Sequence, residues 1–196
     1  MNKVLSNVPS EIPVGSTILY PTETVYGLGC RYDDDDALKA IYRLKGRDGK
    51  VPVALIASER SWVEEHFELP HTASTLMDAH WPGPLAMLLK PIDPEQFRNV
   101  IHDGFVGVRV SGSPVSRALA AACGGGIVST SANLSGEPTP LSWQQCPGSI
   151  RQGVSIVIDG GELAKAPPST LIRFDENGAV DVLRQGSIRV DQYAST

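Results

Sequence analysis

The chain has 196 residues, of which 41% are hydrophobic and 20% are charged, values that are ordinary for a globular protein. This length suffices for one domain with a sizeable core and needs no disulfide or metal staples. The formal net charge of −5 argues against a general nucleic-acid coat, because surfaces that track phosphates are usually basic overall. A small anionic ligand held by a few local arginines remains compatible with this charge.

The cysteines and the N-terminal residues indicate where the protein resides. Cys30, Cys123 and Cys146 are odd in number and too widely separated for a Cys-x-x-Cys metal pair, so we interpret them as reduced thiols. The histidines also lack metal-ligand spacing. Residues 1–11 lack the apolar core of a signal peptide, and no stretch approaches the ~20 apolar residues that span a bilayer. We therefore expect a cytoplasmic protein without a protein-built metal site.

The predicted elements begin with a short buried strand at 18–20, followed by a helix from Ala37 to about Lys45. The acidic run Asp33 to Asp36 precedes this helix. It could suggest a metal site, but aspartates also cap a helix N-terminus and complement its dipole, and we favour that interpretation.

The remaining elements alternate at first and are mostly strands later. We predict strands at 53–56, 85–89, 106–110 and 127–128, helices at 61–67, 72–80 and 114–123, a turn at 81–84, and late strands at 154–158, 170–174 and 180–183. Strands interleaved with helices, then strands alone, indicate an α/β fold with a mixed sheet. With no linker or repeat in view, we expect a single domain over 1–196, with its core at about 10–190.

Two polar loops are expected where predicted strands end. They are Pro21-Thr22-Glu23-Thr24-Val25-Tyr26-Gly27-Leu28-Gly29 and Ser129-Thr130-Ser131-Ala132-Asn133-Leu134-Ser135-Gly136. Such ends expose backbone N–H groups and hydroxyl donors, which suit an anionic ligand. For the second loop, a hydrogen-bonded turn with a capped helix start is the alternative. Two such ends in one chain predict a single cleft assembled from both halves.

Basic residues follow several predicted elements. The segment Lys45-Gly46-Arg47-Asp48-Gly49-Lys50 either balances the dipole of the first helix or reaches phosphates, although its spacing is not that of a P-loop. Arg109 and Arg184 each end a strand, and each could form a structural salt bridge or bind a ligand. Ser169-Thr170 either starts a strand or presents two hydroxyls to the cleft. Together, such cations could clamp a triphosphate.

The sequence contains no Gly-x-Ser-x-Gly elbow, His-Glu-x-x-His pattern or dinucleotide-binding Gly-x-Gly-x-x-Gly. No nucleophile–base pair is evident either. A site rich in donors and poor in nucleophiles suits a reaction in which the substrates react with each other. The protein would then mainly position them and neutralise charge.

The chain resembles the YrdC-like family of L-threonylcarbamoyladenylate synthases, in its short single-domain form. The matching segments occur in family order over about residues 18–188; they are Tyr20–Gly29, Ile41–Arg47, Trp81–Pro84, Val106–Val110, Ser129–Gly136, Asp159–Gly161, Ser169–Leu171 and Leu183-Arg184. The resemblance implies a twisted mixed α/β sheet with flanking helices around a basic cavity. It also implies an ATP-dependent nucleotidyltransferase that condenses L-threonine, bicarbonate and ATP, with Mg²⁺, to threonylcarbamoyl-AMP and pyrophosphate.

The resemblance also implies roles for individual residues. Lys45 and Arg47 would be catalytic and hold ATP phosphates, Ser131, Asn133 and Arg184 would line the nucleotide site, and Thr24, Arg109, Ser129 and Ser169 would bind threonine. The product would pass to a tRNA threonylcarbamoyl transferase complex that modifies adenosine 37, and weak tRNA binding remains open. Departures from the family pattern at Asp48, Ile56, Pro168 and Gln185 bear on the amino-acid specificity.

Two other functions use the same cavity. A module that binds structured RNA would show strongly salt-dependent affinity without nucleotide turnover. The acidic net charge and the scarcity of aromatic residues weigh against it. A carbamoyl transferase that uses carbamoyl phosphate is the third possibility, and the absence of zinc-finger and acylphosphatase regions weighs against that one.

Overall fold

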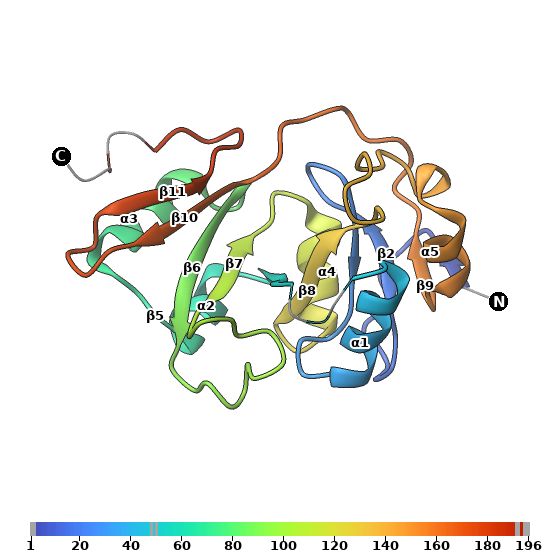
Figure 1. The fold of residues 1–196 in the computed structure, drawn as a ribbon, viewed down its shortest axis with the longest axis horizontal. Coiled ribbons are helices and arrows are strands. Elements are labelled where there is room, and N and C mark those ends of the chain that lie inside the picture. Colours follow the sequence, from blue (N-terminus) through green and yellow to red (C-terminus); the bar gives the residue numbers. More distant parts are fainter. Residues whose placement is uncertain (1–2, 48, 50, 191–192, 194–196) are drawn as a thin grey trace.

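The computed structural model describes residues 3–47, 49, 51–190 and 193. The chain forms one mixed sheet in the strand order β1-β9-β2-β3-β8-β4-β7-β6-β10-β11, with β5 paired to β6 beside this path (Figure 1). The strands are β1 (Lys3–Leu5), β2 (Ile18–Pro21), β3 (Tyr26–Gly29), β4 (Ala54–Ala57), β5 (Phe67–Glu68), β6 (Leu85–Pro91), β7 (Val106–Val110), β8 (Gly126–Ser131), β9 (Ile156–Ile158), β10 (Thr170–Phe174) and β11 (Val180–Arg184).

Parallel and antiparallel pairs alternate near the centre of the sheet. Strand β4 runs parallel to β7 and antiparallel to β8, and β6 runs antiparallel to β7 but parallel to β10. The helices are α1 (Asp35–Leu44), α2 (Arg60–His66), α3 (His71–His80), α4 (Pro114–Ala122) and α5 (Gly148–Gly153), with a short 3-10 turn η1 (Trp143–Gln145). The predicted mixed α/β architecture is thus confirmed.

The first predicted loop is wrong over its second half, because Tyr26–Gly29 forms strand β3 between β2 and β8. Two glycines there indicated a loop, but they serve close packing within the sheet. A Cβ on Gly29 would lie 2.1 Å from the backbone oxygen of Val128, and one on Gly27 would lie 3.1 Å from the Tyr20 ring. Glycine is therefore required by backbone approach rather than by a turn. The second predicted loop likewise begins inside β8, at Ser129 to Ser131.

The acidic run before α1 caps the helix, as predicted. The Asp34 side chain accepts hydrogen bonds from the backbone N–H of Ala37 at 3.0 Å and of Gly15 at 2.5 Å. Asp35 and Asp36 lie in the first turn, where a carboxylate complements the helix dipole. Among the described residues no group of three His, Cys, Asp or Glu side chains could hold a metal ion.

The two faces of the sheet are covered differently. Side chains of α1, α2, α3 and α5 pack with one face in the larger core, which includes Leu55, Val108 and Val128. On the other face α4 covers a patch of buried side chains, among them Tyr20 and Ile56. In the part of the chain that the structure describes, no other helix covers this second face over β6 and β7, and the site described below lies there.

No helix in the described ranges is long and apolar enough to cross a membrane.

Candidate functional site

A pocket of about 700 Å³ lies over the sheet face that α4 leaves uncovered. Its floor is a row of residues that face one another across four neighbouring strands. Ser129 of β8 is paired with Ala54 of β4, Ala54 with Gly107 of β7, and Gly107 with Leu88 of β6. All four line the pocket, so the floor changes from a hydroxyl at one end to an aliphatic side chain at the other.

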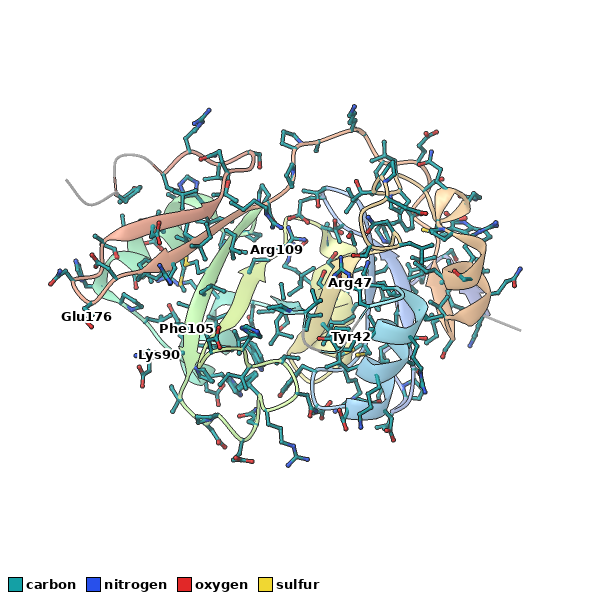
Figure 2. All side chains as sticks on the ribbon, viewed as in Figure 1. Tyr42, Arg47, Lys90, Phe105, Arg109 and Glu176 are labelled. Carbon is teal, nitrogen blue, oxygen red and sulfur yellow. The ribbon has the colours of Figure 1, made fainter. Side chains whose placement is uncertain are left out.

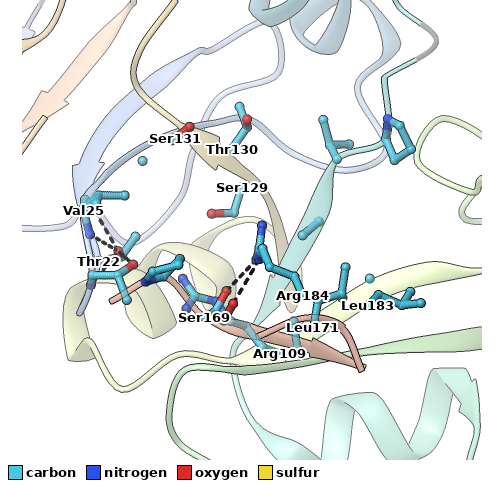
Figure 3. A pocket seen from close by; sticks show the side chains of 18 of the residues that line it. Thr22, Val25, Arg109, Ser129, Thr130, Ser131, Ser169, Leu171, Leu183 and Arg184 are labelled. Carbon is cyan, nitrogen blue, oxygen red and sulfur yellow. Dashed lines mark hydrogen bonds between the residues drawn. The ribbon is translucent and has the colours of Figure 1, made fainter. Parts of the chain in front are cut away.

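The pocket is lined by two kinds of side chain, some of which Figure 3 labels. The polar lining, called the polar end below, consists of Thr22, Thr24, Arg47, Arg109, Ser129, Thr130, Ser131, Ser169 and Arg184; Ser129 to Ser131 belong to β8, whereas Ser169 and Arg184 lie beyond β6 at β10 and β11. The apolar lining, called the apolar end below, includes Val53, Ala54, Ala86, Leu88, Val100, Phe105, Gly107 and Leu171, with His102 next to Phe105. Of the described residues that line the pocket, none is acidic, and the three arginines carry its charge. Such a pocket can hold a ligand that is anionic at one end and apolar at the other.

The structure brings together most of the residues that the sequence predicted for the site. Thr24, Arg47, Arg109, Ser129, Ser131, Ser169 and Arg184 all line this pocket. Lys45 and Asn133 do not line it; they lie behind Ser131. The predicted cleft built from both motifs is confirmed, since Gly27 of β3 pairs with Ser131 of β8.

Arg47 is directed by the end of helix α1. The backbone N–H of Gly46 donates to the Arg43 carbonyl at 3.1 Å and that of Arg47 to the Tyr42 carbonyl at 3.0 Å, which is the Schellman pattern. Gly46 adopts a φ of +61°, as this C-terminal turn requires. Arg47, labelled in Figure 2, lines the pocket, and its buried Nε has no hydrogen-bond partner among the residues that the structure describes. A buried, unpaired donor of a cationic group is suited to an anionic ligand.

Lys45 holds the second motif from behind. Its ammonium donates to the backbone carbonyls of Ser131 and Asn133, the latter at 2.7 Å, and lies 3.4 Å from the Asn133 side-chain oxygen. The Ser131 hydroxyl donates to that same side-chain oxygen. Burial, aided by the charge of Arg47, lowers the pKa of Lys45 to about 8. In the described structure Lys45 therefore supports the pocket wall, and its contact with phosphate stays a prediction.

Arg109 forms a salt bridge and also lines the pocket, so the salt-bridge alternative is confirmed and ligand binding stays a prediction. Its Nη1 donates to Glu23 Oε1 at 2.6 Å, with side chains 9% and 17% exposed. The other carboxylate oxygen of Glu23 accepts from the Ser111 hydroxyl. Sequence reasoning did not single out Glu23. The signal was its place beside Thr22 and Thr24 in the first motif.

Arg184 is bound to Ser169 at the rim of the pocket. Its Nε donates to the Ser169 carbonyl at 3.1 Å and its Nη2 to the Ser169 hydroxyl at 3.0 Å. Partial removal from water, followed by the charge of Arg109, lowers the pKa of Arg184. A Cβ on Gly186 would lie 2.1 Å from the Pro168 carbonyl oxygen, so the segment of Arg184 can approach Ser169 this closely only with glycine at 186.

The Thr22 hydroxyl closes the first motif into a turn. It accepts hydrogen bonds from the N–H groups of Thr24 and Val25, each at 3.1 Å, and donates to the Val25 carbonyl at 2.7 Å.

The buried Tyr26 hydroxyl donates to the Gly161 carbonyl and accepts from the Gly160 N–H, both at 2.9 Å. Tyr26 thereby ties the start of the long connection between β9 and β10 to the site.

The positions that depart from the family pattern have different surroundings. Pro168 lines the pocket, Ile56 is buried under α4, and the Gln185 side chain donates to the carbonyls of Gly186 and Ile188. Asp48 lies outside the described residues. Of the three described positions, Pro168 lines the pocket and Ile56 and Gln185 do not.

Comparisons with known proteins agree with this geometry. The Sua5/YciO/YrdC family model, described as "Telomere recombination", matches residues 11–186. A threonylcarbamoyl-AMP synthase of Xanthomonas oryzae is 36% identical over 182 residues, covering 90% of this chain and 95% of the relative. Some curated relatives are longer, and this chain spans about half their length.

Two solved structures are similar over most of the chain. Sua5 of Pyrococcus abyssi complexed with L-threonine has a TM-score of 0.77 and 30% identity, covering 91% of this chain and 52% of that one. YciO of Escherichia coli has a TM-score of 0.78 and 25% identity, covering 98% of this chain and 100% of that one.

Proposed function

This chain belongs to the Sua5/YciO/YrdC family, and we propose from this membership that it is a threonylcarbamoyl-AMP synthase that uses L-threonine, bicarbonate and ATP. One structural observation supports the proposal independently of the names of the relatives. The pocket joins three arginines and a series of hydroxyls to an apolar end, on one continuous floor. ATP combines a polyanionic triphosphate with a flat, weakly polar base, and this pocket offers a surface for each.

The polar end supports the binding of both substrates. Arg47, whose buried Nε has no partner among the described residues, would contact the triphosphate together with Ser131 and Arg184. Thr24, Ser129 and Ser169 would donate or accept hydrogen bonds with threonine, and Arg109 would pair with its carboxylate. Lys45 and Asn133 would act on the nucleotide through the Ser131 turn that they hold.

The chemistry requires alignment more than it requires a protein nucleophile. The threonine amine takes up CO₂ from bicarbonate to give a carbamate, with loss of water. A carbamate oxygen then attacks the α-phosphorus in line, and pyrophosphate leaves. Arginines fixed around the phosphates would stabilise the negative charge that develops there.

Magnesium would enter with the substrate. The pocket offers hydroxyls but no carboxylate among its described lining residues, so these residues do not form a metal site on their own. Mg²⁺ would therefore be bound by the phosphate oxygens of a Mg–ATP complex rather than by carboxylates of the pocket.

The domain organisation, the cellular location and the downstream partner belong to the same proposal. The described residues form one continuous sheet, which supports a single domain over the given sequence. The product would be passed in the cytoplasm to a tRNA threonylcarbamoyl transferase complex. Free threonylcarbamoyl-AMP would hydrolyse in water, so a short path to that complex would favour the yield of modified tRNA.

Pyrophosphate release tests the proposal directly. The purified protein is given Mg–ATP, with L-threonine and bicarbonate added together or omitted singly. Release that requires both supports the synthase. Release with another amino acid would support the same reaction with a different amino-acid substrate. No release under any condition, together with tight salt-sensitive tRNA binding, would favour the RNA-binding alternative.

A further inference from the structure

Glu23 lies between the pocket and the start of helix α4. Its two carboxylate oxygens are divided between two partners: Oε1 accepts from Arg109 Nη1 at 2.6 Å and Oε2 from the Ser111 hydroxyl. The Glu23 side chain is 17% exposed and is absent from the pocket lining, whereas Arg109 lines it. Glu23 therefore touches the pocket only through Arg109.

The segment that carries Glu23 is held in place by helix α4. The Pro21 carbonyl accepts hydrogen bonds from the hydroxyls of Ser113 at 3.3 Å and Ser116 at 3.1 Å. Arg117 of the same helix donates to the Ser111 carbonyl at 2.6 Å. Glu23 thus has a fixed backbone and a fixed second partner, and it can hold Arg109 in one orientation.

An arginine that recognises a carboxylate needs a partner that anchors it in this way. The guanidinium is planar and presents its N–H groups in a rigid fork, so fixing one corner sets the direction of the remaining donors. The charge also needs a partner while the pocket is empty, because Arg109 is only 7% exposed and has the cationic Arg184 close by. Glu23 supplies both the anchor and the charge.

We propose that Glu23 is a positioning residue that orients Arg109 toward the carboxylate of the amino-acid substrate, and that Ser111 supports it from behind. This inference rests on the proposed function for the presence of an amino acid in the pocket. The inference goes beyond the proposed function by naming how the carboxylate is recognised. The consequence is a specificity: the enzyme distinguishes an α-amino acid from the corresponding amino alcohol through the Glu23–Arg109 pair.

The test compares L-threonine with L-threoninol, which has the same side chain and amine but no carboxylate. Binding of each compound is measured by titration calorimetry in the presence of a non-hydrolysable Mg–ATP analogue. The variants are Glu23→Gln, which keeps shape and one acceptor but loses the charge, and Ser111→Ala, which keeps the ion pair. Glu65→Gln is the matched control, since Glu65 is exposed on α2 away from the pocket.

The wild-type protein should bind L-threonine at least 10-fold more tightly than L-threoninol. In Glu23→Gln this ratio should fall at least fivefold through weaker binding of L-threonine, with the affinity for L-threoninol and for the ATP analogue within twofold of wild type. Ser111→Ala should lower the ratio by a smaller factor, and Glu65→Gln should leave it unchanged. In turnover, Glu23→Gln should raise the KM for L-threonine more than it lowers kcat.

Substitution of a residue with a merely structural role would give a different result. It would weaken the binding of L-threonine, L-threoninol and the nucleotide together, and it would lower the melting temperature. An unchanged ratio in folded Glu23→Gln overturns the inference. If that variant does not fold, an unchanged ratio in Ser111→Ala overturns it instead.

The failure of the proposed function gives a distinct result. If wild-type protein binds no L-threonine, the titration is repeated with the amino acid that supports pyrophosphate release and its amino alcohol. A wild-type protein that binds no amino acid at all overturns both proposals. A wild-type protein that prefers the carboxylate, with an unchanged preference in both variants, overturns only the role of Glu23 and Ser111.

Discussion

The ammonium of Lys45 lies 2.7 Å from the backbone carbonyl oxygen of Asn133, a residue 88 positions further along the chain. This contact joins the end of α1 to the turn that follows β8, so the two sequence motifs form one wall. Lys45 is 1% exposed, and the hydrogen bonds of its side chain all go to the Ser131–Asn133 segment. From its sequence motif Lys45 resembles a phosphate ligand. In this structure its side chain supports the wall of the pocket.

Replacing Lys45 by methionine should therefore reduce both stability and activity. The variant leaves buried carbonyls of Ser131 and Asn133 without their donor, and a lost buried partner costs about 1–3 kcal/mol. Chemical denaturation measures the free energy of unfolding, and pyrophosphate release measures activity. An unchanged stability with lost activity would instead indicate that Lys45 acts only on the ligand.

The same residue predicts a dependence of stability on pH. Burial lowers the pKa of Lys45 from 10.5 to about 8, so between these values the unfolded chain binds more protons than the folded one. Its contribution to the free energy of unfolding must then rise with pH from about 8 to about 10.5 and be constant below that window.

The difference between wild type and Lys45→Met isolates this contribution. Burial raises the pKa of Cys123 to about 12 and that of Cys146 to about 11, and these thiols contribute an opposite slope in both proteins. Denaturation curves at pH 7.5, 9 and 10.5 should show the wild type gaining stability relative to the variant. A difference that stays flat over this range would show that Lys45 has an ordinary pKa.

Arg47→Ala should abolish turnover while the protein stays folded. The Arg47 side chain lines the pocket, its Nε has no partner within the described ranges, and it contributes little to the core. Loss of a charge-stabilising donor should reduce pyrophosphate release by about 10²-fold or more. Arg43→Ala, on the exposed side of the same helix, is the control and should keep activity. Full activity, or unfolding, of Arg47→Ala would refute a phosphate role.

Gly107→Val should close the apolar end of the pocket. A Cβ at this position would lie 3.5 Å from Leu88 and 3.7 Å from Ala54, which are ordinary contacts, so the fold should accept the substitution. The added methyl groups would instead project over the pocket floor. We expect the ATP affinity to fall at least 10-fold with Gly107→Val and only a few-fold with Gly107→Ala.

Calorimetric titration with an ATP analogue measures this loss, and the melting temperature is its control. If Gly107→Val binds the analogue as wild type does, the base does not occupy the apolar end. L-Threonine binding should change less than nucleotide binding, because the residues proposed to bind L-threonine are hydroxyls and Arg109 rather than the apolar side chains beside Gly107.

Gly186→Ala should destabilise the segment that carries Arg184. Its Cβ would lie 2.1 Å from the Pro168 carbonyl oxygen and 2.5 Å from the Ser169 carbonyl carbon, so the backbone must shift. Such overpacking costs about 1–3 kcal/mol and should loosen the Arg184–Ser169 contact. Gly148→Ala, which meets nothing within 4 Å, is the matched control. Equal unfolding free energies for the two variants would contradict this packing.

Much of the architecture could be predicted from local patterns. The buried strands β2, β4, β6 and β7 are short apolar runs, and the helix after Asp34 begins with a capping aspartate. Strand β3 could not be predicted, because its glycines disfavour a strand locally. It forms because β2 and β8 pair with it on both sides and need close approach at Gly29.

The sequence by itself determined the order of elements, the polar strand ends and most of the residues at the polar end of the pocket. These features depend on hydrophobic period, helix caps and residue chemistry, which act over a few positions. Only the tertiary structure decided that Lys45 lies behind Ser131, that Glu23 is paired with Arg109, and that Gly107 opens the apolar end. Each of these depends on strand register and on contacts between residues far apart in the chain, about which local sequence preference carries no information.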